Sequence, residues 1–525
     1  MSQTVTVLGG GITGLSAAWF LAQRLPPTAR IQLVEGSSRL GGWVRTDRRQ
    51  VDGTSFIAEK GPRTLRTGRS REALAALELI DDLDLRSDVI VAQKTSAAAR
   101  NRYILYNGEL NCMPTGIGSL ITGLPPAVRC LPRGIWHDLT TKSDTPEGVT
   151  DESINSFVSR RFGQDVDDNL ASAVMHGIYA ADTKVLSARA LLYPFWLADH
   201  TGKTGVLRGL RRVAKLSRAR NTKHALRDAE ERYSISKRRM QNREFWSMID
   251  DASMYSFRDG MQTLTDRLAS RLAECPNVDI ITDQPASEAR VGADGNAEIV
   301  LSNGSVVQAQ HVINTLPLYK IRSLFKGRSS NVLLDETPYA SVAVVNVTYT
   351  KRNIVPVDGF GYLVPRASAA NSKALGVVFD SCSLPQQDGD AEISRLSVML
   401  GGSRFDELFG SPATVTKDVL ENAAMETISN HLGIKAAPSD IDATVGQHCI
   451  PSYTVGYIDR LKSMHEWVQA QLGGRMSVVG AAYGGPAVPQ CIMHARDLVN
   501  HHLRLDALEK PQLVSGLEDI ISGFE

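Results

Sequence analysis

Short apolar runs and helical periodicity alternate at the start of the chain. Residues 5–8 are apolar except for one threonine and end at glycine, which predicts a buried β-strand. Apolar residues then recur over 12–22 at the spacing of one helix face. A second apolar strand, 31–34, ends at Glu35. The order strand, glycine turn, helix, strand predicts the first unit of a Rossmann-like domain.

A similar pattern returns near the other end of the chain. Residues 476–479 form a short apolar strand that leads into the glycine-rich segment 480–488, and we expect a helix to begin at Ile492. Strands are also predicted over 278–282 and 312–315. The last strand–helix unit is therefore expected to complete the domain that the first unit begins.

The middle of the chain has two other patterns. Residues 91–254 are mostly helical in composition and are interrupted by Pro/Gly breaks. Residues 341–350 alternate with period two, so Ala343, Val345, Val347 and Tyr349 share one strand face. Further strands at 376–379 and 395–400 and a helix at 425–432 complete a predicted antiparallel sheet.

These patterns predict an α/β protein, with a Rossmann-like nucleotide-binding domain, an inserted antiparallel-sheet substrate domain and an inserted helical domain. The nucleotide-binding domain is expected to be discontinuous. The expected boundaries are 1–90, 255–316 and 445–510 for the nucleotide-binding domain, 91–254 for the helical domain, 317–444 for the substrate domain and 511–525 for a C-terminal tail.

Composition and charge narrow the classes of function. The 525 residues are 42% apolar and 22% charged, an ordinary globular balance. With 58 basic and 57 acidic residues the net charge is +1, so we expect no nucleic-acid partner bound through global charge. The six cysteines form no C-x-x-C pair, which argues against a disulfide framework and a thiolate zinc site. We also expect no signal or transit peptide. The sequence contains no apolar run of the roughly 18 residues that are needed to span a bilayer.

The first glycine turn has the spacing of a dinucleotide site. In G-x-G-x-x-G, the first two glycines allow a sharp turn and a close approach of the backbone to a pyrophosphate, and the third allows close helix packing. Glu35 lies 21 residues past Gly14, where an acid accepts hydrogen bonds from an adenosine ribose. An acid at this place disfavours a 2′-phosphate. The predicted nucleotide-binding residues of this turn are Gly9, Gly10, Gly11, Ile12, Thr13, Gly14 and Glu35.

This turn alone leaves NAD and FAD open. A second glycine pair follows the acid in 39–45, a third glycine turn lies in 59–63, and the glycine segment 480–488 comes from the far end. A simple NAD domain closes within one continuous half of a chain, whereas a site built from both ends suits the long, extended FAD.

Several segments resemble the flavin amine-oxidase superfamily and, more closely, its protoporphyrinogen oxidase family of mitochondrial type. They follow the family order over nearly the whole chain. The segments are 40–45, 61–63, 101–103, 113–116, 359–365, 398–402, 450–456 and 487–492. Two of them, 101–103 and 359–365, are not general flavoprotein motifs.

The resemblance implies FAD as the cofactor, bound non-covalently because the surroundings of Cys449 follow the non-covalent members. Thr64 stands where the family has glycine, and Ala286 replaces a common valine near the adenine. The further FAD residues implied are Gly42, Trp43, Gly61, Pro62, Arg63, Thr64, Ala286, Gly480, Pro486, Ala487 and Val488.

The resemblance also implies the substrate and the reaction, which are protoporphyrinogen IX and its six-electron oxidation to protoporphyrin IX. Dioxygen would accept the electrons and give hydrogen peroxide, in haem biosynthesis. Arg102 would pair with a substrate propionate, Gly177 would let backbone approach the macrocycle, and Phe360, Leu363, Val378 and Met399 would hold it. By spacing alone these four apolar residues are typical of a protein core. No acid–base motif and no metal site are present, so the flavin itself is expected to carry the chemistry.

Two other classes of function stay open at this point. One is a different flavin enzyme, either another amine oxidase or a coproporphyrinogen oxidase. The other is a non-catalytic binding protein on the same fold, which would keep the first glycine turn and bind no flavin.

The segment 203–243 is strongly basic, with 14 Lys/Arg against 3 Asp/Glu, a local net charge of +11. Leu207, Leu210, Val213 and Ala214 form an apolar stripe along it. A solvated loop and a helix lying on anionic lipid are both consistent with this pattern. The resemblance implies a monotopic protein on the intermembrane-space side of the mitochondrial inner membrane, and it raises a homodimer as a candidate assembly.

Overall fold

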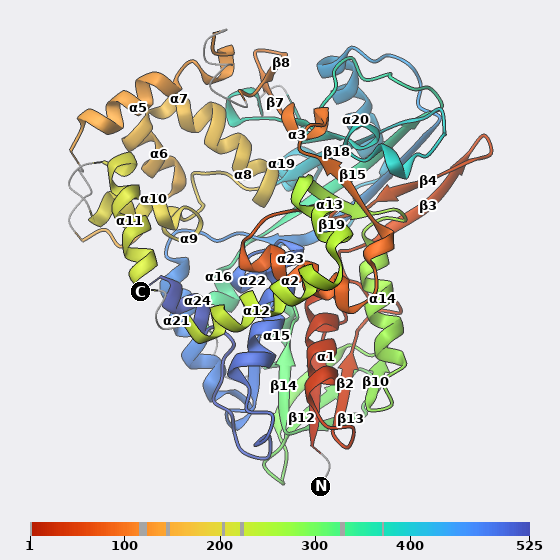
Figure 1. Ribbon diagram of the computed structural model, residues 1–525, viewed down its shortest axis with the longest axis vertical. Helices are drawn as coiled ribbons and strands as arrows, with labels where there is room; N and C mark the ends of the chain where they lie inside the picture. Colours follow the sequence, from red (N-terminus) through yellow and green to blue (C-terminus); the bar gives the residue numbers. More distant parts are fainter. Residues whose placement is uncertain are drawn as a thin grey trace.

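A parallel five-stranded sheet organises the lower half of the molecule in Figure 1. The computed structural model describes residues 3–114, 123–142, 148–201, 205–220, 225–325, 331–369 and 372–524. Residues 115, 116, 203, 204 and 221–224 of the predicted motifs lie outside this part of the chain. The strand order is β10 (Val278–Ile281), β2 (Arg30–Val34), β1 (Thr4–Leu8), β14 (His311–Asn314) and β20 (Met476–Val478).

The two ends of the chain meet in this sheet, since β20 pairs with β14 and β14 pairs with β1. Helices α1 (Ile12–Arg24), α14 (Gln262–Ala273) and α23 (Val488–Asp497) contribute to one apolar core with it. The expected start of the last helix at Ile492 was wrong, because α23 begins at Val488. Pro489 sits in its first turn, where proline needs no backbone partner.

A mixed seven-stranded sheet occupies the upper right of Figure 1. Its face towards α20 (Lys417–Leu432) buries Ala343, Val345, Val347 and Tyr349, the residues that the alternation placed together. The strand order is β19 (Asp440–Pro451), β15 (Tyr339–Tyr349), β18 (Ser394–Gly402), β17 (Ala374–Phe379), β16 (Gly361–Leu363), β7 (Tyr103–Tyr106) and β8 (Glu109–Cys112).

This sheet does not follow the expected boundaries. Strands β7 and β8 come from the segment assigned to the helical domain, and β19 runs across the boundary at 444. The short strand β16 pairs on one side with β17 and on the other with β7, in parallel. The hairpin β7–β8 thus completes the sheet from outside 317–444, which a one-dimensional pattern does not reveal.

Three smaller elements connect these layers. The hairpin β3 (Thr46–Val51) and β4 (Thr54–Glu59) projects at the right of Figure 1. A three-stranded sheet has the order β5 (Leu65–Arg66), β9 (Ala252–Phe257) and β6 (Val89–Gln93). A second three-stranded sheet consists of β11 (Ala286–Val291), β12 (Ala297–Leu301) and β13 (Val306–Ala309).

The helical unit includes α5 (Leu131–Thr140), α6 (Ile154–Phe162), α8 (Ser172–Tyr179), α10 (Tyr193–Thr201) and α11 (Val206–Arg220), at the upper left of Figure 1. The basic helix α11 turns Val213 and Leu210 inward against the core of this unit. A Cβ on Gly209 would lie 2.3 Å from the Ala198 carbonyl oxygen, so α10 and α11 pack closely. Of the two alternatives, the solvated loop is wrong for Val206–Arg220, which is a helix, and an apolar stripe open to lipid is wrong for Leu210 and Val213, which pack against the protein.

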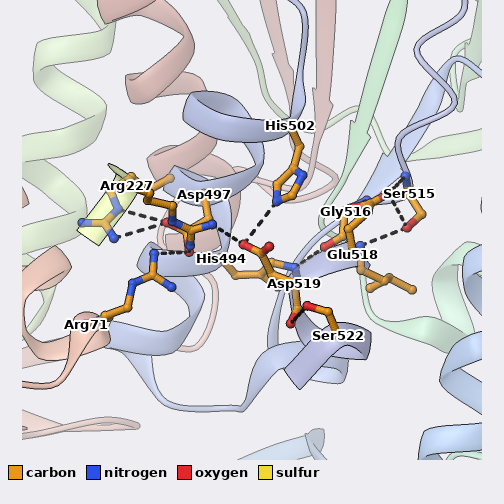
Figure 2. A network of polar contacts seen from close by, with 12 residues as sticks. Arg71, Arg227, His494, Asp497, His502, Ser515, Gly516, Glu518, Asp519 and Ser522 are labelled. Carbon is orange, nitrogen blue, oxygen red and sulfur yellow. Dashed lines mark hydrogen bonds and ion pairs between the residues drawn. The ribbon is translucent and has the colours of Figure 1, made fainter. Parts of the chain in front are cut away.

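The other half of the basic segment, α12 (Ala225–Gln241), is tied to the body of the protein by ion pairs. Arg227 pairs with both Asp497 and Asp519, as Figure 2 shows, and Asp497 also accepts from Arg71 at 3.0 Å. Arg238 pairs with Asp81 at 2.8 Å. These cations bind carboxylates of α2 (Arg71–Asp82), α23 and α24 (Glu518–Gly523). Within the described ranges no helix is both long and apolar enough to cross a membrane.

Candidate functional site

The first glycine turn packs without room for side chains. A Cβ on Gly14 would lie 1.8 Å from the Gly9 carbonyl oxygen, so only glycine allows α1 to start this close to β1. The Gly10 N–H donates to Glu35 Oε2 at 2.6 Å. Glu35 Oε1 accepts from the N–H and the hydroxyl of Ser37, at 2.9 and 2.7 Å. A carboxylate accepts about four hydrogen bonds, so capacity for a ribose hydroxyl remains.

The second glycine pair lies directly against the first turn. Gly41 forms a parallel β-bridge with Gly11, and a Cβ on Gly42 would lie 3.1 Å from the Gly11 Cα. Arg39 holds this loop by donating to the carbonyl oxygens of Leu40, Gly42 and Val44.

The remaining glycine segments reach the same place. A Cβ on Gly61 would lie 2.1 Å from the Trp43 carbonyl oxygen, which brings the third glycine turn onto the second. Gly480 faces Thr13, because its Cβ would lie 3.7 Å from the Thr13 hydroxyl. Four segments distant in sequence therefore surround one space. Pro486 and Ala487 directly precede Val488, which opens α23, and Pro62 and Thr64 flank Arg63 in the third turn.

Arg63 is buried beside the seven-stranded sheet. Its Nη1 donates to Asp380 Oδ1 at 2.9 Å, while its Nη2 is buried without a partner in the structure. An unsatisfied guanidinium nitrogen costs free energy unless a further acceptor is bound. The cradle of four glycine segments, the acid at Glu35 and this free donor fit a bound flavin dinucleotide.

The substrate residues expected from the sheet share one face of it. In the strand register Leu363 lies opposite Gly376, and Gly376 opposite Met399. Val378 lies opposite Ser397 on the same face. Leu363, Val378 and Met399 are all half-buried, whereas their neighbours in sequence are buried in the core on the other face. Apolar side chains that stay partly accessible in this way line a surface rather than fill a core.

Helix α8 covers part of this face. A Cβ on Gly177 would lie 2.7 Å from the Leu363 Cδ2, so the glycine lets the helix reach the sheet. Beside it, His176 Nδ1 lies 3.0 Å from the Val364 carbonyl oxygen, which accepts the N–H. Burial lowers the pKa of His176, so the ring is held neutral as a structural donor.

Arg102 lies at one edge of this face, with its guanidinium carbon 5.7 Å from the centre of the Phe360 ring. Burial, together with the nearby cation Arg66, lowers the pKa of Arg102. Among the described residues Arg102 forms no ion pair and its side chain no hydrogen bond. A half-buried cation that lacks an acidic neighbour is an unusual surface residue and a ready site for an anion.

Sequence reasoning missed a polar cluster that joins the seven-stranded sheet to β4 and the third glycine turn. Ser397 Oγ lies 2.6 Å from Asp380 Oδ2 and 2.8 Å from Asn346 Oδ1, and Asn346 Nδ2 donates to the Glu59 carbonyl oxygen at 3.0 Å. Asp380 thereby links Arg63 to the sheet face that holds Val378. Asn346 and Ser397 are polar residues within apolar strands, and that irregularity was the one available signal.

Two of the predicted FAD residues, Ala286 and Trp43, do not belong to the polar cluster around Asp380. Ala286 opens β11 on the Glu35 side, since the preceding Gln284 N–H donates to the Glu35 carbonyl oxygen at 3.1 Å. Trp43 leaves about half of its side chain exposed, at 49%. Cys449 is largely buried, and burial raises the pKa of its thiol to about 11, so it is a weak nucleophile near neutral pH.

Comparisons with known proteins agree with this geometry. The family described as flavin containing amine oxidoreductase matches residues 12–496. Protoporphyrinogen oxidase of Schizosaccharomyces pombe is 33% identical over 94% of this chain and 96% of its own length. The human protoporphyrinogen oxidase is 32% identical over 94% of this chain and 97% of its own. Among solved structures, a protein from Exiguobacterium superimposes with a TM-score of 0.72 at 21% identity, covering 95% of this chain and 98% of its own.

Proposed function

Because the chain belongs to the flavin containing amine oxidoreductases and, within them, to the protoporphyrinogen oxidases, we propose that it oxidises protoporphyrinogen IX to protoporphyrin IX. Dioxygen accepts the electrons and is reduced to hydrogen peroxide. The protein is an enzyme of haem biosynthesis, and its cofactor is FAD, held without a covalent bond.

The four glycine segments and Glu35 would hold the dinucleotide. The pyrophosphate would lie along the first turn, where backbone N–H groups and the start of α1 favour negative charge. Glu35 would accept from the adenosine ribose, and Arg63 would donate its free Nη2 to the cofactor or to the substrate beside it. When bound, the flavin would supply the two-electron acceptor that each of the three oxidation steps needs.

The apolar sheet face would orient the substrate. A porphyrinogen is an apolar macrocycle with carboxylates along one edge. Leu363, Val378, Met399 and Phe360 would contact the macrocycle, and Gly177 would let α8 close over it. These contacts exclude water from the reacting carbon and fix the plane of the ring. They leave rotation within that plane undetermined.

Arg102 would determine this rotation, and it is the observation that carries the proposal. Its guanidinium lies at the edge of the apolar face, half-buried and with no acidic partner in the described part of the chain. A planar guanidinium binds a carboxylate through two parallel hydrogen bonds. A substrate with an apolar body and a carboxylate at its rim matches this pair of features, whereas a simple amine has neither.

The test compares substrates on the flavin-loaded enzyme. Protoporphyrinogen and coproporphyrinogen are supplied separately, and porphyrin fluorescence and hydrogen peroxide are followed. We expect a yellow protein and faster turnover of protoporphyrinogen. A colourless protein would favour a binding protein on the same fold, and preference for coproporphyrinogen would favour the other porphyrinogen oxidase.

Arg102→Ala should lower kcat/KM about 10- to 100-fold, since a hydrogen-bonded charge of this kind contributes about 1.5–3 kcal/mol. Arg102→Lys should retain a kcat/KM between those of Arg102→Ala and wild type, because lysine keeps the charge and loses the paired donors. Flavin content should not change. Arg258→Ala, which removes an exposed arginine beyond the end of β9, is the matched control.

We also propose a peripheral attachment to the mitochondrial inner membrane on its intermembrane-space side, through the helical unit. The surface that supports it combines α5 and α11. Trp136 and Ile135 of α5 are 70% and 43% exposed, and Arg208, Arg211 and Arg212 of α11 are exposed nearby. Asp138 of α5 joins the two helices by accepting the N–H groups of Val206 and Leu207 at 3.0 and 2.9 Å. Exposed aromatic and basic side chains together suit a lipid headgroup layer.

Each structural unit of the protein would then have its own role. The five-stranded sheet would carry FAD, the seven-stranded sheet with β7 and β8 would carry the substrate, and α5 and α11 of the helical unit would contact lipid. A homodimer is a further proposal, which sedimentation of the purified enzyme would test.

A further inference from the structure

Arg66 is a second arginine whose side chain lies on the substrate side of the protein. It ends β5, where it pairs with Met254 of β9, and Met254 pairs in turn with Ala92 of β6. Residues that face each other across antiparallel strands point to the same side of the sheet. Arg66, Met254 and Ala92 therefore share one face.

The other face of this small sheet belongs to the core of the nucleotide-binding unit. Leu65, Tyr255 and Val91 lie on it and are buried in that core. Met254 and Ala92 instead form a separate apolar cluster, against which Phe360 packs. The face that carries Arg66 is thus the one that meets the substrate sheet.

Phe360 connects this face to Arg102. The Phe360 ring packs on the Met254 and Ala92 side while the Arg102 guanidinium lies 5.7 Å from the ring centre. Arg66 and Arg102 are 36 residues apart in the chain, and Arg66 ends β5 whereas Arg102 directly precedes β7 of another sheet. Both border the same aromatic wall of the proposed substrate site.

The charges of this corner are not balanced within the described protein. Neither Arg66 nor Arg102 forms an ion pair with a described residue, and the charged neighbour that acts on Arg102 is Arg66 itself. Two like charges that border one site raise the free energy of that site when it is empty. An anion that contacts both removes this repulsion, so the pair favours a ligand with more than one negative charge.

We propose that Arg66 binds a second carboxylate of the substrate, so that Arg66 and Arg102 together select a porphyrinogen with two adjacent carboxylates. This inference rests on the proposed function. Arg102 is half-buried and sets the orientation, whereas Arg66 is exposed at the rim and adds affinity. The enzyme would therefore distinguish a dicarboxylate from its diester mainly through KM.

The experiment measures kcat and KM on the flavin-loaded enzyme for protoporphyrinogen and for its dimethyl ester. The variants are Arg66→Ala, Arg66→Lys and Arg102→Ala, with Arg258→Ala as a matched control that removes another exposed arginine near the end of β9. The quantity compared is the ratio of kcat/KM for the free acid to kcat/KM for the diester. Flavin content and kcat show whether a variant is folded and loaded.

Arg66→Ala should lower this ratio about two- to fivefold, the size expected of an exposed ion pair, by raising KM for the free acid. Arg66→Lys should recover much of the loss, because a point charge serves at an exposed rim. Raised salt should shrink the difference between wild type and Arg66→Ala. Arg258→Ala should leave the ratio at the wild-type value.

A ratio unchanged by Arg66→Ala but lowered by Arg102→Ala would overturn the role of Arg66 and leave the proposed function standing. Equal losses on free acid and diester would also overturn it, since they would mark Arg66 as a structural residue. A ratio unchanged in both variants would overturn the proposed substrate orientation as well.

Discussion

Replacing Glu59 by glutamine tests whether the polar cluster that joins β4 to the seven-stranded sheet holds a protonated carboxyl group. Glu59 is 4% exposed at the end of β4. Its carboxyl oxygens accept from the Met261 N–H and the Thr46 hydroxyl, both at 2.7 Å. Burial raises the pKa of Glu59 to about 7, although both donors and the charge of Arg63 favour the ionised form. Glutamine has the same shape, retains one oxygen acceptor and never ionises.

The sign of the effect follows from the direction of this change. A carboxyl whose pKa is higher in the folded state binds its proton more tightly there, so it stabilises the fold at low pH. That contribution is complete below about pH 4.5 and is lost as the pH rises through about 7. A rise from 4.5 to about 7 corresponds to about 3 kcal/mol, at about 1.4 kcal/mol for each tenfold change in proton affinity. The glutamine variant lacks this pH dependence.

The stability of Glu59→Gln relative to wild type should therefore increase by about 3 kcal/mol between pH 4.5 and pH 8.5. Thermal unfolding of the flavin-loaded protein, followed by tryptophan fluorescence at one scan rate, gives Tm at each pH. The difference in Tm should grow by several degrees towards high pH. Glu109→Gln, at an exposed position of β8, is the control. Parallel pH profiles for Glu59→Gln and wild type would refute the reasoning and show that water reaches the carboxyl group.

Three further predictions concern the cofactor, the substrate face and the membrane surface. Acid precipitation should leave all flavin in the supernatant, and flavin retained in the pellet on Cys449 would contradict non-covalent binding. Gly177→Val should lower kcat/KM with unchanged flavin content, because its side chain would displace Leu363, whose Cδ2 lies 2.7 Å from a Cβ at this position; normal turnover would show that α8 is not part of the site. The protein should pellet with anionic liposomes and be released by detergent. Trp136→Ser should weaken liposome binding more than the control Tyr233→Ser, which replaces an exposed aromatic residue of α12. Equal effects of the two substitutions would place the lipid contact elsewhere.

The local elements of the fold were predictable from sequence because their signals are local. The first strand, turn and helix depend on residues 4–24, and the alternation over 341–350 reproduces the face of β15 that packs towards α20. The sequence did not predict which parts of the protein pack against each element. Helix α11 would be amphipathic both on a lipid surface and against the protein interior. Only the presence of α10 decides that Leu210 and Val213 pack inward. Periodicity shows that a helix has an apolar face but contains no information about what covers it.

The same limit applies to the candidate site. Leu363, Val378 and Met399 have the composition of core residues, and it is the pairing of β16, β17 and β18 that brings them onto one partly accessible face. Glu59 is buried in the folded chain and accepts a hydrogen bond from Met261, 202 positions away in the sequence. A motif therefore identifies which residues matter, while their chemistry comes from neighbours that only the folded chain supplies.

The Arg63–Asp380 pair shows why these neighbours come from different units. Arg63 belongs to the glycine turn of the nucleotide site, and Asp380 follows β17 of the substrate sheet. Both side chains are largely buried, and removing either partner would leave an uncompensated charge, which typically costs about 3–5 kcal/mol. The pair thus holds the third glycine turn in one position relative to the substrate sheet, with Ser397 fixing Asp380 from the substrate face at 2.6 Å. A flavin and a rigid macrocycle can react only if their separation and tilt are fixed, and a buried charge pair spanning the two sites is the kind of contact that fixes them.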